Sequence, residues 1–266
     1  MLYKDKSMRS YKKNKLIYRI CELANLAKEG HVPSALSVLD IVWVIYNKII
    51  NCRLVKQKSP SRDYFIMSKG HGCLAQYVVM EEKKFFLRKE LNTFGKFYSK
   101  FGGHPSTNKI KAIEASTGSL GHGFPLAAGV AYAAKLKNYK SRVYVLIGDG
   151  ECNEGTIWET CLLASHYKLN NLICIIDNNK STYRSLKIQK LKNKFKSFDW
   201  KTIIVDGHDH AKLIKSFKTK SNKPIVIIAN TIKGKGIKIM ENAQYEWHHK
   251  TIENLTLEKI KADLTI

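Results

Sequence analysis

Short apolar runs alternate with amphipathic stretches over the second half of the chain. The runs at residues 142–147, 171–177, 202–207 and 223–231 are continuous and rich in β-branched residues. Apolar residues recur at spacings of three and four near 153–167 and at 211–218, and earlier at 16–27 and 35–50, which predicts helices. Continuous apolar strands separated by helices predict an α/β fold, with a parallel sheet that carries helices on both faces.

Polar residues and glycines stand where the predicted strands end. Asp149, the pair Asn178 and Asn179, Gly207 and Gly234 all occupy such positions. Ligands of parallel α/β sheets bind beyond the carboxyl ends of the strands. We therefore expect these residues to lie near one rim of the sheet, where a ligand binds.

The turn Gly148-Asp149-Gly150 follows its strand directly and leads into a predicted helix. An aspartate at the end of a buried strand must be solvated, hydrogen-bonded or bound to a cation, and an ordinary junction capped by Asp149 would satisfy this. Asn179 follows the next predicted strand and adds a second hard oxygen ligand, of the kind Mg²⁺ takes together with phosphate oxygens. Gly150 leaves room for a phosphate at the N-terminus of the following helix. Together, Asp149, Gly150 and Asn179 therefore predict a site for a diphosphate that is bridged by a metal ion.

Composition narrows the cellular context. The 266 residues, 44% of them hydrophobic, suffice for one large α/β domain or at most two small ones. No apolar run approaches the roughly 20 residues of a membrane span, and no apolar signal segment follows the basic start. Six scattered cysteines without a C-x-x-C pair indicate reduced thiols. We predict a cytoplasmic protein with no membrane partner.

The net charge of +24 raises nucleic-acid binding as a rival function. Only seven of the 46 basic residues are Arg, and the lysines are spread along the chain. Surfaces that read bases favour Arg forks, and no helix-turn-helix, zinc or RNP pattern occurs. We therefore predict no nucleic-acid partner, although part of the charge can attract anionic ligands or an acidic partner.

The two strand-end motifs, GDGECNEG and IIDNNK, resemble the thiamine diphosphate-binding motif. Five further segments occur in the order typical of transketolase: residues 27–46, 63–72, 101–106, 117–123 and 231–249. The chain is thereby identified as a member of the transketolase family, in its N-terminal, thiamine diphosphate-binding region. The resemblance runs from about residue 15 to 250 and predicts a basic N-terminal segment, 1–14, followed by a diphosphate-binding domain, 15–266.

The resemblance assigns the diphosphate and metal to four positions. Asp149 and Asn179 would ligate Mg²⁺, or Ca²⁺ or Mn²⁺ in its place, with the backbone carbonyl of Ser181 as a third ligand. Asn178 is the alternative to Asn179 if the register slips by one. Gly150 would donate its amide to the diphosphate.

A glycine and a leucine in TGSLG, Gly118 and Leu120, would meet the aminopyrimidine ring of the cofactor. Many relatives read TGPLGQG there, so Ser119 and His122 are departures. We expect the backbone contacts to survive them in a loop that is less rigid without the proline.

Four histidines, His31, His71, His104 and His248, lie in segments that match family active-site motifs. A lone histidine is more often a surface residue or a hydrogen-bonded core residue than a catalytic one. The resemblance implies that His71 contacts the diphosphate, that His31 and His248 flank the reacting carbon of the cofactor, and that His104 binds a sugar hydroxyl. Imidazole suits these roles because it exchanges protons near neutral pH. We rank His248 above its neighbour His249.

Two further assignments leave alternatives open. Glu154 matches a family glutamate that links two cofactor sites across a subunit interface, yet a first-turn helix carboxylate would also be stabilised by the helix dipole. The stretch 180–185 departs most from the family, because Lys180 and Tyr183 stand where relatives have a glycine and aliphatic residues packed on the thiazolium. A changed substrate is compatible with that departure.

The chain ends at Ile266, less than half of a usual transketolase, and lacks the family's pyrimidine-binding domain with its glutamate. We therefore expect the N-terminal subunit of a split transketolase, active only with a separate C-terminal subunit in a heterotetramer. It would transfer a two-carbon ketol unit from a ketose to an aldose, with sugars or sugar phosphates as substrates. The alternatives are a thiamine diphosphate enzyme for an unusual sugar or a 2-keto acid, and a non-catalytic regulatory paralogue.

Overall fold

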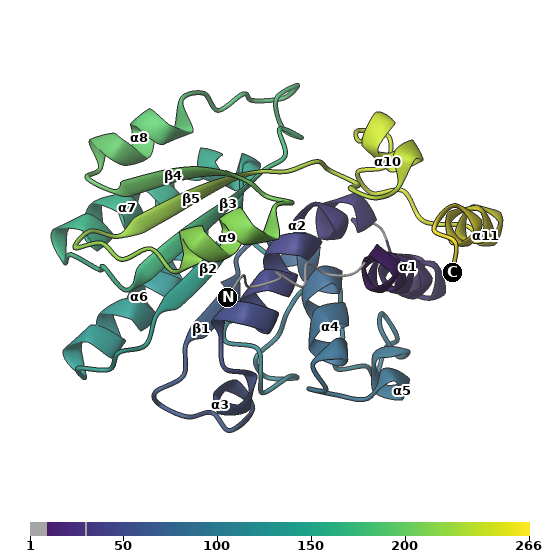
Figure 1. Cartoon of the computed structure of the whole chain (residues 1–266), viewed down its shortest axis with the longest axis horizontal. Coiled ribbons are helices and arrows are strands. Elements are labelled where there is room, and N and C mark those ends of the chain that lie inside the picture. Colours follow the sequence, from purple (N-terminus) through teal and green to yellow (C-terminus); the bar gives the residue numbers. More distant parts are fainter. Residues whose placement is uncertain (1–9, 30) are drawn as a thin grey trace, which may run out of the picture.

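Five parallel strands form the single sheet of the computed structural model, which describes residues 10–29 and 31–266 (Figure 1). Their order is β1-β2-β3-β5-β4. The strands are β1 (Tyr64–Met67), β2 (Val143–Gly148), β3 (Leu172–Asn178), β4 (Lys201–Asp206) and β5 (Ile225–Asn230). The predicted parallel α/β fold is confirmed. β1 is not among the predicted strands, because a run of four apolar residues is too short to stand out in the sequence.

Helices cover both faces of the sheet (Figure 1). Alternate residues of the central strands point to opposite layers: Tyr144 and Leu146 pack into one core, and Val143 and Val145 into the other. One layer contains α6 (Gly123–Leu136), α7 (Gly155–His166) and α8 (Leu191–Ser197). The other contains α1 (Ser10–Ala27), α2 (Val32–Val44), α4 (Cys73–Glu82), α9 (His210–Phe217), α10 (Lys238–Asn242) and α11 (Asn254–Asp263), with the short α3 (Cys52–Lys56) and α5 (Arg88–Leu91) beside them.

α2 is the central helix of its layer. Every residue of α2 is buried, and the helix continues as a π-helical turn, Ile45–Ile49. The joined stretch Val32–Ile49 has the length and apolar composition of a membrane span, although the sequence analysis predicts no such span. It is 83% buried inside the fold and contacts α1, α4 and α9. Burial by these neighbours explains its apolar sequence as that of a core helix.

The central strands of the sheet are more deeply buried than the edge strand β4, as the strand order predicts. β3 is buried throughout and β5 almost so, because each has a strand on either side and a helix on either face. β4 lies at the edge, and most of its residues are exposed or half-buried. The six cysteines are free thiols, and all except Cys52 are buried.

Two predicted boundaries differ in the structure. α1 begins at Ser10, so residues 10–14 of the predicted N-terminal segment belong to this helix, and residues 1–9 lie outside the described part of the chain. The turn after Asp149 does not enter a helix at once. A 3-10 turn, Gly150–Asn153, comes first, and α7 starts at Gly155.

Neighbouring strands end at the same edge of the sheet, and each is followed by polar residues. Lys69 follows β1, Asp149 follows β2, Asn179 follows β3 and Lys233 follows β5. Because parallel strands bring their carboxyl ends together, the fold gathers four segments that are distant in sequence at one rim.

Candidate active site

A cavity of about 300 Å³ opens at this rim. All the predicted site residues except Glu154 line it: His31, His71, His104, Gly118, Leu120, Asp149, Gly150, Asn179, Ser181 and His248. Six residues without a predicted role complete the lining: Ser34, Lys69, Gly148, Glu151, Thr182 and Lys233. The structure thus brings together residues from the whole length of the chain.

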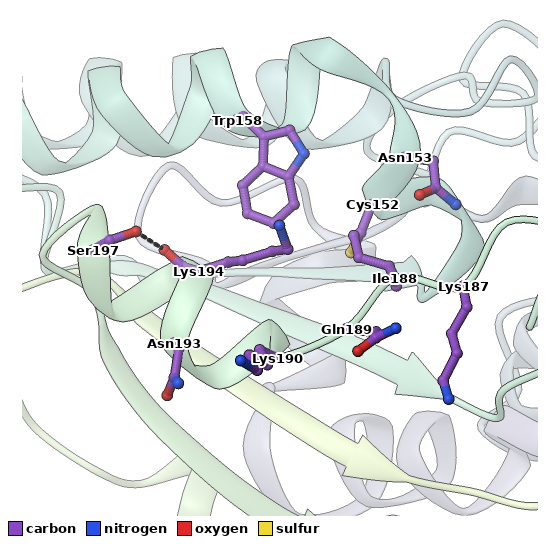
Figure 2. A pocket seen from close by; sticks show the side chains of 10 residues that line it. All are labelled: Cys152, Asn153, Trp158, Lys187, Ile188, Gln189, Lys190, Asn193, Lys194 and Ser197. Atoms are coloured by element: carbon purple, nitrogen blue, oxygen red, sulfur yellow. Dashed lines mark hydrogen bonds between the residues drawn. The ribbon is translucent and has the colours of Figure 1, made fainter.

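A larger hollow of about 720 Å³ lies between α7, α8 and the segment before α8 (Figure 2). It contains none of the predicted site residues. Lys187, Lys190 and Lys194 line it without a carboxylate, and the Lys194 ammonium lies 5.9 Å from the ring of Trp158. It is a basic surface hollow, separate in its lining from the site at the rim.

Asp177, the last residue but one of β3, is the centre of the hydrogen-bond network beneath the cavity. Its fully buried carboxylate forms an ion pair with Lys69 and accepts a hydrogen bond from Thr231. It also accepts from Ser37 at 2.5 Å and from the Asn179 amide at 2.7 Å. Burial by itself would raise the pKa of Asp177, but Lys69 and the hydroxyl donors hold it below its usual range. The ionised carboxylate therefore fixes the orientation of Asn179.

Lys233 brings a buried ammonium into the cavity. Its side chain is only 2% exposed, and it forms no ion pair with a carboxylate of residues 10–29 or 31–266. Its ammonium lies 3.1 Å from Nδ1 of His248. Burial, and then the charge of Lys69, lower the pKa of Lys233 to about 8. A buried ammonium without a carboxylate is costly unless an anion binds beside it, so the cavity suits a diphosphate.

The histidines form a cluster around His31, which precedes α2. The ring of His31 lies 5.2 Å from that of His71, 5.7 Å from that of His248 and 4.6 Å from that of His249. Its backbone is left-handed, at φ 62°, and its Nδ1 is buried without a hydrogen-bond partner in the described chain. Such a backbone with an unused ring nitrogen is typical of a functional position.

The surroundings lower the pKa of His31, His71 and His248 and so favour their neutral form. Burial, followed by the charges of His249 and His248, lowers the pKa of His31 to about 4. Burial and the charge of Lys69 lower the pKa of His71 to about 2, and partial burial with Lys233 lowers that of His248. At neutral pH the rings can therefore donate and accept hydrogen bonds without carrying charge.

Asp149 and Asn179 supply the oxygens that a metal ion would need. The Asp149 carboxylate accepts the amide of Gly150 at 2.8 Å and that of Lys180 at 2.6 Å, and Oδ1 of Asn179 accepts the amide of Ser181 at 3.0 Å. Each oxygen keeps a further lone pair. Burial, and then the charge of Asp177, raise the pKa of Asp149 to about 6, which a bound cation would reverse.

The protein alone does not complete a metal site. The described residues contain no cluster of three His, Cys, Asp or Glu side chains that could hold an ion. Two side-chain oxygens fit Mg²⁺ where phosphate oxygens and water complete the shell. Asn178 is not part of the cavity lining, since its amide instead donates to Asn230 at 2.7 Å. The register therefore favours Asn179.

Some predicted residues lie apart from the cluster. Glu154 is exposed at the start of α7 and does not line the cavity, so its role across an interface stays a prediction. Tyr183 does not line the cavity either, whereas Thr182 does, with a buried hydroxyl that has no hydrogen-bond partner in the described chain. The methyl of Thr182 packs against Gly150, where a Cβ would lie 2.4 Å from it.

Sequence analysis predicts no role for Lys69, Asp177 and Lys233, although each lies in a segment that resembles the transketolase family. The sequence does contain a local indication of all three. Lys69 lies in SKGHG, Asp177 in IIDNNK and Lys233 in TIKGKG, and each is a charged residue at or near the end of an apolar strand. A charge in that position must be paired, and only the fold reveals the partner.

Comparison with known proteins agrees with this geometry. Residues 15–265 match the family described as "Transketolase, thiamine diphosphate binding domain". Two relatives are each named as one subunit of apulose-4-phosphate transketolase. The protein of Phocaeicola vulgatus is 37% identical over 87% of this chain and 84% of its own length, and that of Actinobacillus succinogenes is 38% identical over 90% of each.

Solved structures show the same fold. The crystal structure of transketolase from Campylobacter jejuni superposes with a TM-score of 0.84 at 26% identity, over 97% of this chain and 43% of that one. The cavity, the sequence family and the fold thus agree. The chain belongs to the transketolase family, as a transferase subunit that comprises its thiamine diphosphate-binding domain.

Proposed function

We propose that this chain is the cofactor-binding subunit of a two-chain transketolase, which transfers a two-carbon ketol unit from a ketose to an aldose. One observation carries the proposal: the buried ammonium of Lys233, without a carboxylate partner in the described chain, faces the same cavity as Asp149, Asn179 and the histidine cluster. This combination supports a metal-bridged diphosphate beside groups that exchange protons. A regulatory paralogue would have no need to keep all of these groups.

The side chains divide the work between holding and proton transfer. When bound, thiamine diphosphate supplies the carbon nucleophile and the electron sink for breaking a carbon–carbon bond beside a carbonyl. Lys233 and His71 would bind its phosphates, Asp149, Asn179 and the Ser181 carbonyl its Mg²⁺, and Gly150 would donate an amide.

Neutral imidazoles would act on the substrate. His31 and His248 can accept a hydroxyl proton and return it, because their lowered pKa keeps them unprotonated at pH 7. His104 stands at the exposed side of the cavity, where it can donate to a sugar hydroxyl. Removing either His31 or His248 should therefore reduce turnover more than cofactor affinity.

A second chain would complete the site. Each of the two relatives is named as one subunit of its enzyme, which implies a further, different chain in that enzyme. Exposed apolar side chains on α6, on α7 and at the residue that caps α7 offer a surface for assembly: Leu126, Leu136, Leu162, Leu163 and Tyr167. We propose a heterotetramer of two copies of each chain. Free, mostly buried thiols support a reducing, cytoplasmic location.

The substrate follows from the relatives. Both proteins named for apulose-4-phosphate transketolase share more than a third of their aligned residues with this chain. We propose a phosphorylated sugar, with apulose-4-phosphate as the first compound to test and 2-keto acids as the competing class. The departures at Lys180 and Tyr183 support a substrate outside the common ketose phosphates.

Titration calorimetry of thiamine diphosphate with Mg²⁺ tests the proposal. The chain is titrated alone and with a transketolase C-terminal-type subunit, while product formation from ketose phosphates is followed by mass spectrometry. We expect tight binding and ketol transfer with the partner present, and loss of binding in Asp149→Ala. Lys233→Met should weaken binding at least about 100-fold, and Lys238→Met, an exposed control, should not. Absence of binding in every combination would contradict the proposal in favour of a regulatory paralogue.

A further inference from the structure

The loop of residues 117–122 carries two proposed cofactor contacts but has no regular secondary structure. Gly118 and Leu120 line the cavity from this loop. Its first residue is held in place, because the Thr117 hydroxyl donates to the Met67 carbonyl at 2.7 Å, at the end of β1. The position of Gly118 and Leu120 then depends on what holds the far end of the loop.

Glu151 holds that end. Its side chain is 1% exposed, and its Oε1 accepts the amide of Gly121 at 2.9 Å and the hydroxyl of Ser68. Its Oε2 accepts the amide of Gly148 at 3.1 Å. One carboxylate thus joins three segments of the site: the residue that follows β1, the last residue of β2 and the loop 117–122.

The same glycine is held from its other side. The Thr156 hydroxyl donates to the Gly121 carbonyl at 2.7 Å. Gly121 has φ +82°, and a Cβ there would lie 2.5 Å from Oγ1 of Thr156, so only glycine allows this approach. The loop is consequently bonded to the turn after β2 through the Gly121 amide, and to the start of α7 through the Gly121 carbonyl.

We infer that Glu151 is a positioning residue, whose buried carboxylate sets the place of Gly118 and Leu120 by holding Gly121 against the Gly148-Asp149-Gly150 turn. The inference rests on the proposed function in one respect, that these two residues contact thiamine diphosphate. All three partners of Glu151 are donors, which requires an acceptor with no hydrogen of its own. A glutamine would turn an NH₂ group toward at least one of them.

Local amide exchange tests the positioning without any cofactor. In the apo chain, the NH₂ group of Glu151→Gln faces the amide of Gly121 or that of Gly148, so exchange of one of these two amides should accelerate at least about tenfold, while the amides of residues 143–147 and of β3 exchange as in the wild type. Glu159→Gln, an exposed carboxylate on α7, serves as the matched control and should change neither. Unchanged exchange at both Gly121 and Gly148 in Glu151→Gln would overturn the inference.

Cofactor binding supplies the second measurement. In the complex with the partner chain, Glu151→Gln should weaken the Kd for thiamine diphosphate with Mg²⁺ at least about tenfold. If Glu151→Gln does not fold, Thr156→Val removes the other bond to Gly121 without disturbing a buried charge, and should weaken the Kd about threefold. Wild-type affinity in the folded variant would overturn the inference. A wild-type chain that binds no cofactor would instead contradict the proposed function, and the exchange result would stand by itself.

Discussion

Nδ1 of His208 lies 2.8 Å from Oδ2 of Asp40, and its Nε2 accepts the backbone amide of Ile232 at 2.9 Å. Because Nε2 is the acceptor, the proton sits on Nδ1 and points to the carboxylate. Ile232 immediately precedes Lys233. The pair thus connects the buried helix α2 to the segment that carries the ammonium of the cavity, although neither residue lines the cavity itself.

Asp40→Asn should lower the free energy of unfolding by about 2 kcal/mol at pH 7, because the buried carboxylate accepts from Lys13, His208 and His210. Burial would raise the pKa of Asp40, but these partners hold it well below its usual range. Its stabilisation is therefore complete above the unfolded pKa near 4 and is lost as pH falls below that value. Urea unfolding should show the largest difference between wild type and variant at pH 7, shrinking toward pH 3. Equal free energies of unfolding for wild type and Asp40→Asn at pH 7 would contradict a stabilising role for the ionised Asp40.

Asp149→Asn should show the opposite pH dependence. The pKa of Asp149 is raised to about 6, so between about pH 4 and 6 the folded chain keeps a proton that the unfolded chain releases. The ionised group then destabilises the apo chain above pH 6. The stability of Asp149→Asn relative to wild type should rise between pH 4 and 7, by up to about 3 kcal/mol.

Binding of Mg²⁺ with thiamine diphosphate depends on the same ionisation. Its affinity should weaken as pH falls through 6, since the metal requires the carboxylate. Calorimetry at pH 5 and 7 measures this directly. A stability difference between wild type and Asp149→Asn that does not change with pH would show that Asp149 ionises normally in the fold.

Asp177 and Lys69 should behave as one unit. Asp177→Asn leaves the buried ammonium of Lys69 without its counter-charge and should cost about 3 kcal/mol of unfolding free energy. Adding Lys69→Met should recover part of that loss, which a double-mutant cycle measures. The exposed pair of Asp199 and Lys223 is the control, where Asp199→Asn should cost less than about 0.5 kcal/mol. Strictly additive losses at Asp177 and Lys69 would refute the coupling.

Leu162→Glu should prevent assembly with the partner chain while leaving the protein folded. Leu162 is 61% exposed on α7, so the substitution places a charge on the proposed interface without opening the core. Leu255, 79% exposed on α11 in the opposite helical layer, provides the control Leu255→Glu. Sedimentation of the mixed chains distinguishes them. Assembly that survives Leu162→Glu would exclude this part of α7 from the interface.

The apolar pattern predicted four of the five strands and the rim at which Asp149 and Asn179 lie, whereas the roles of the histidines, Gly118 and Leu120 came from the resemblance to transketolase. Runs such as 171–177 are continuous because β3 is covered on both faces, so hydrophobicity alone predicts a buried parallel strand. The same reasoning placed Asp149 and Asn179 at one rim, since parallel strands end together. It could not find β1, whose four residues are fewer than a periodicity needs.

Charge pairing and loop placement depended on the folded chain. Lys69 and Asp177 are 108 residues apart, and Glu151 and Gly121 are 30 apart, and no local pattern specifies that they meet. A sequence records which side chains are apolar, because burial acts on each residue separately. Hydrogen bonds and ion pairs require two groups within about 3 Å, so their partners exist only once strands and helices are packed. Composition and periodicity thus predict the scaffold and the rim, and packing selects the residues that hold the site together.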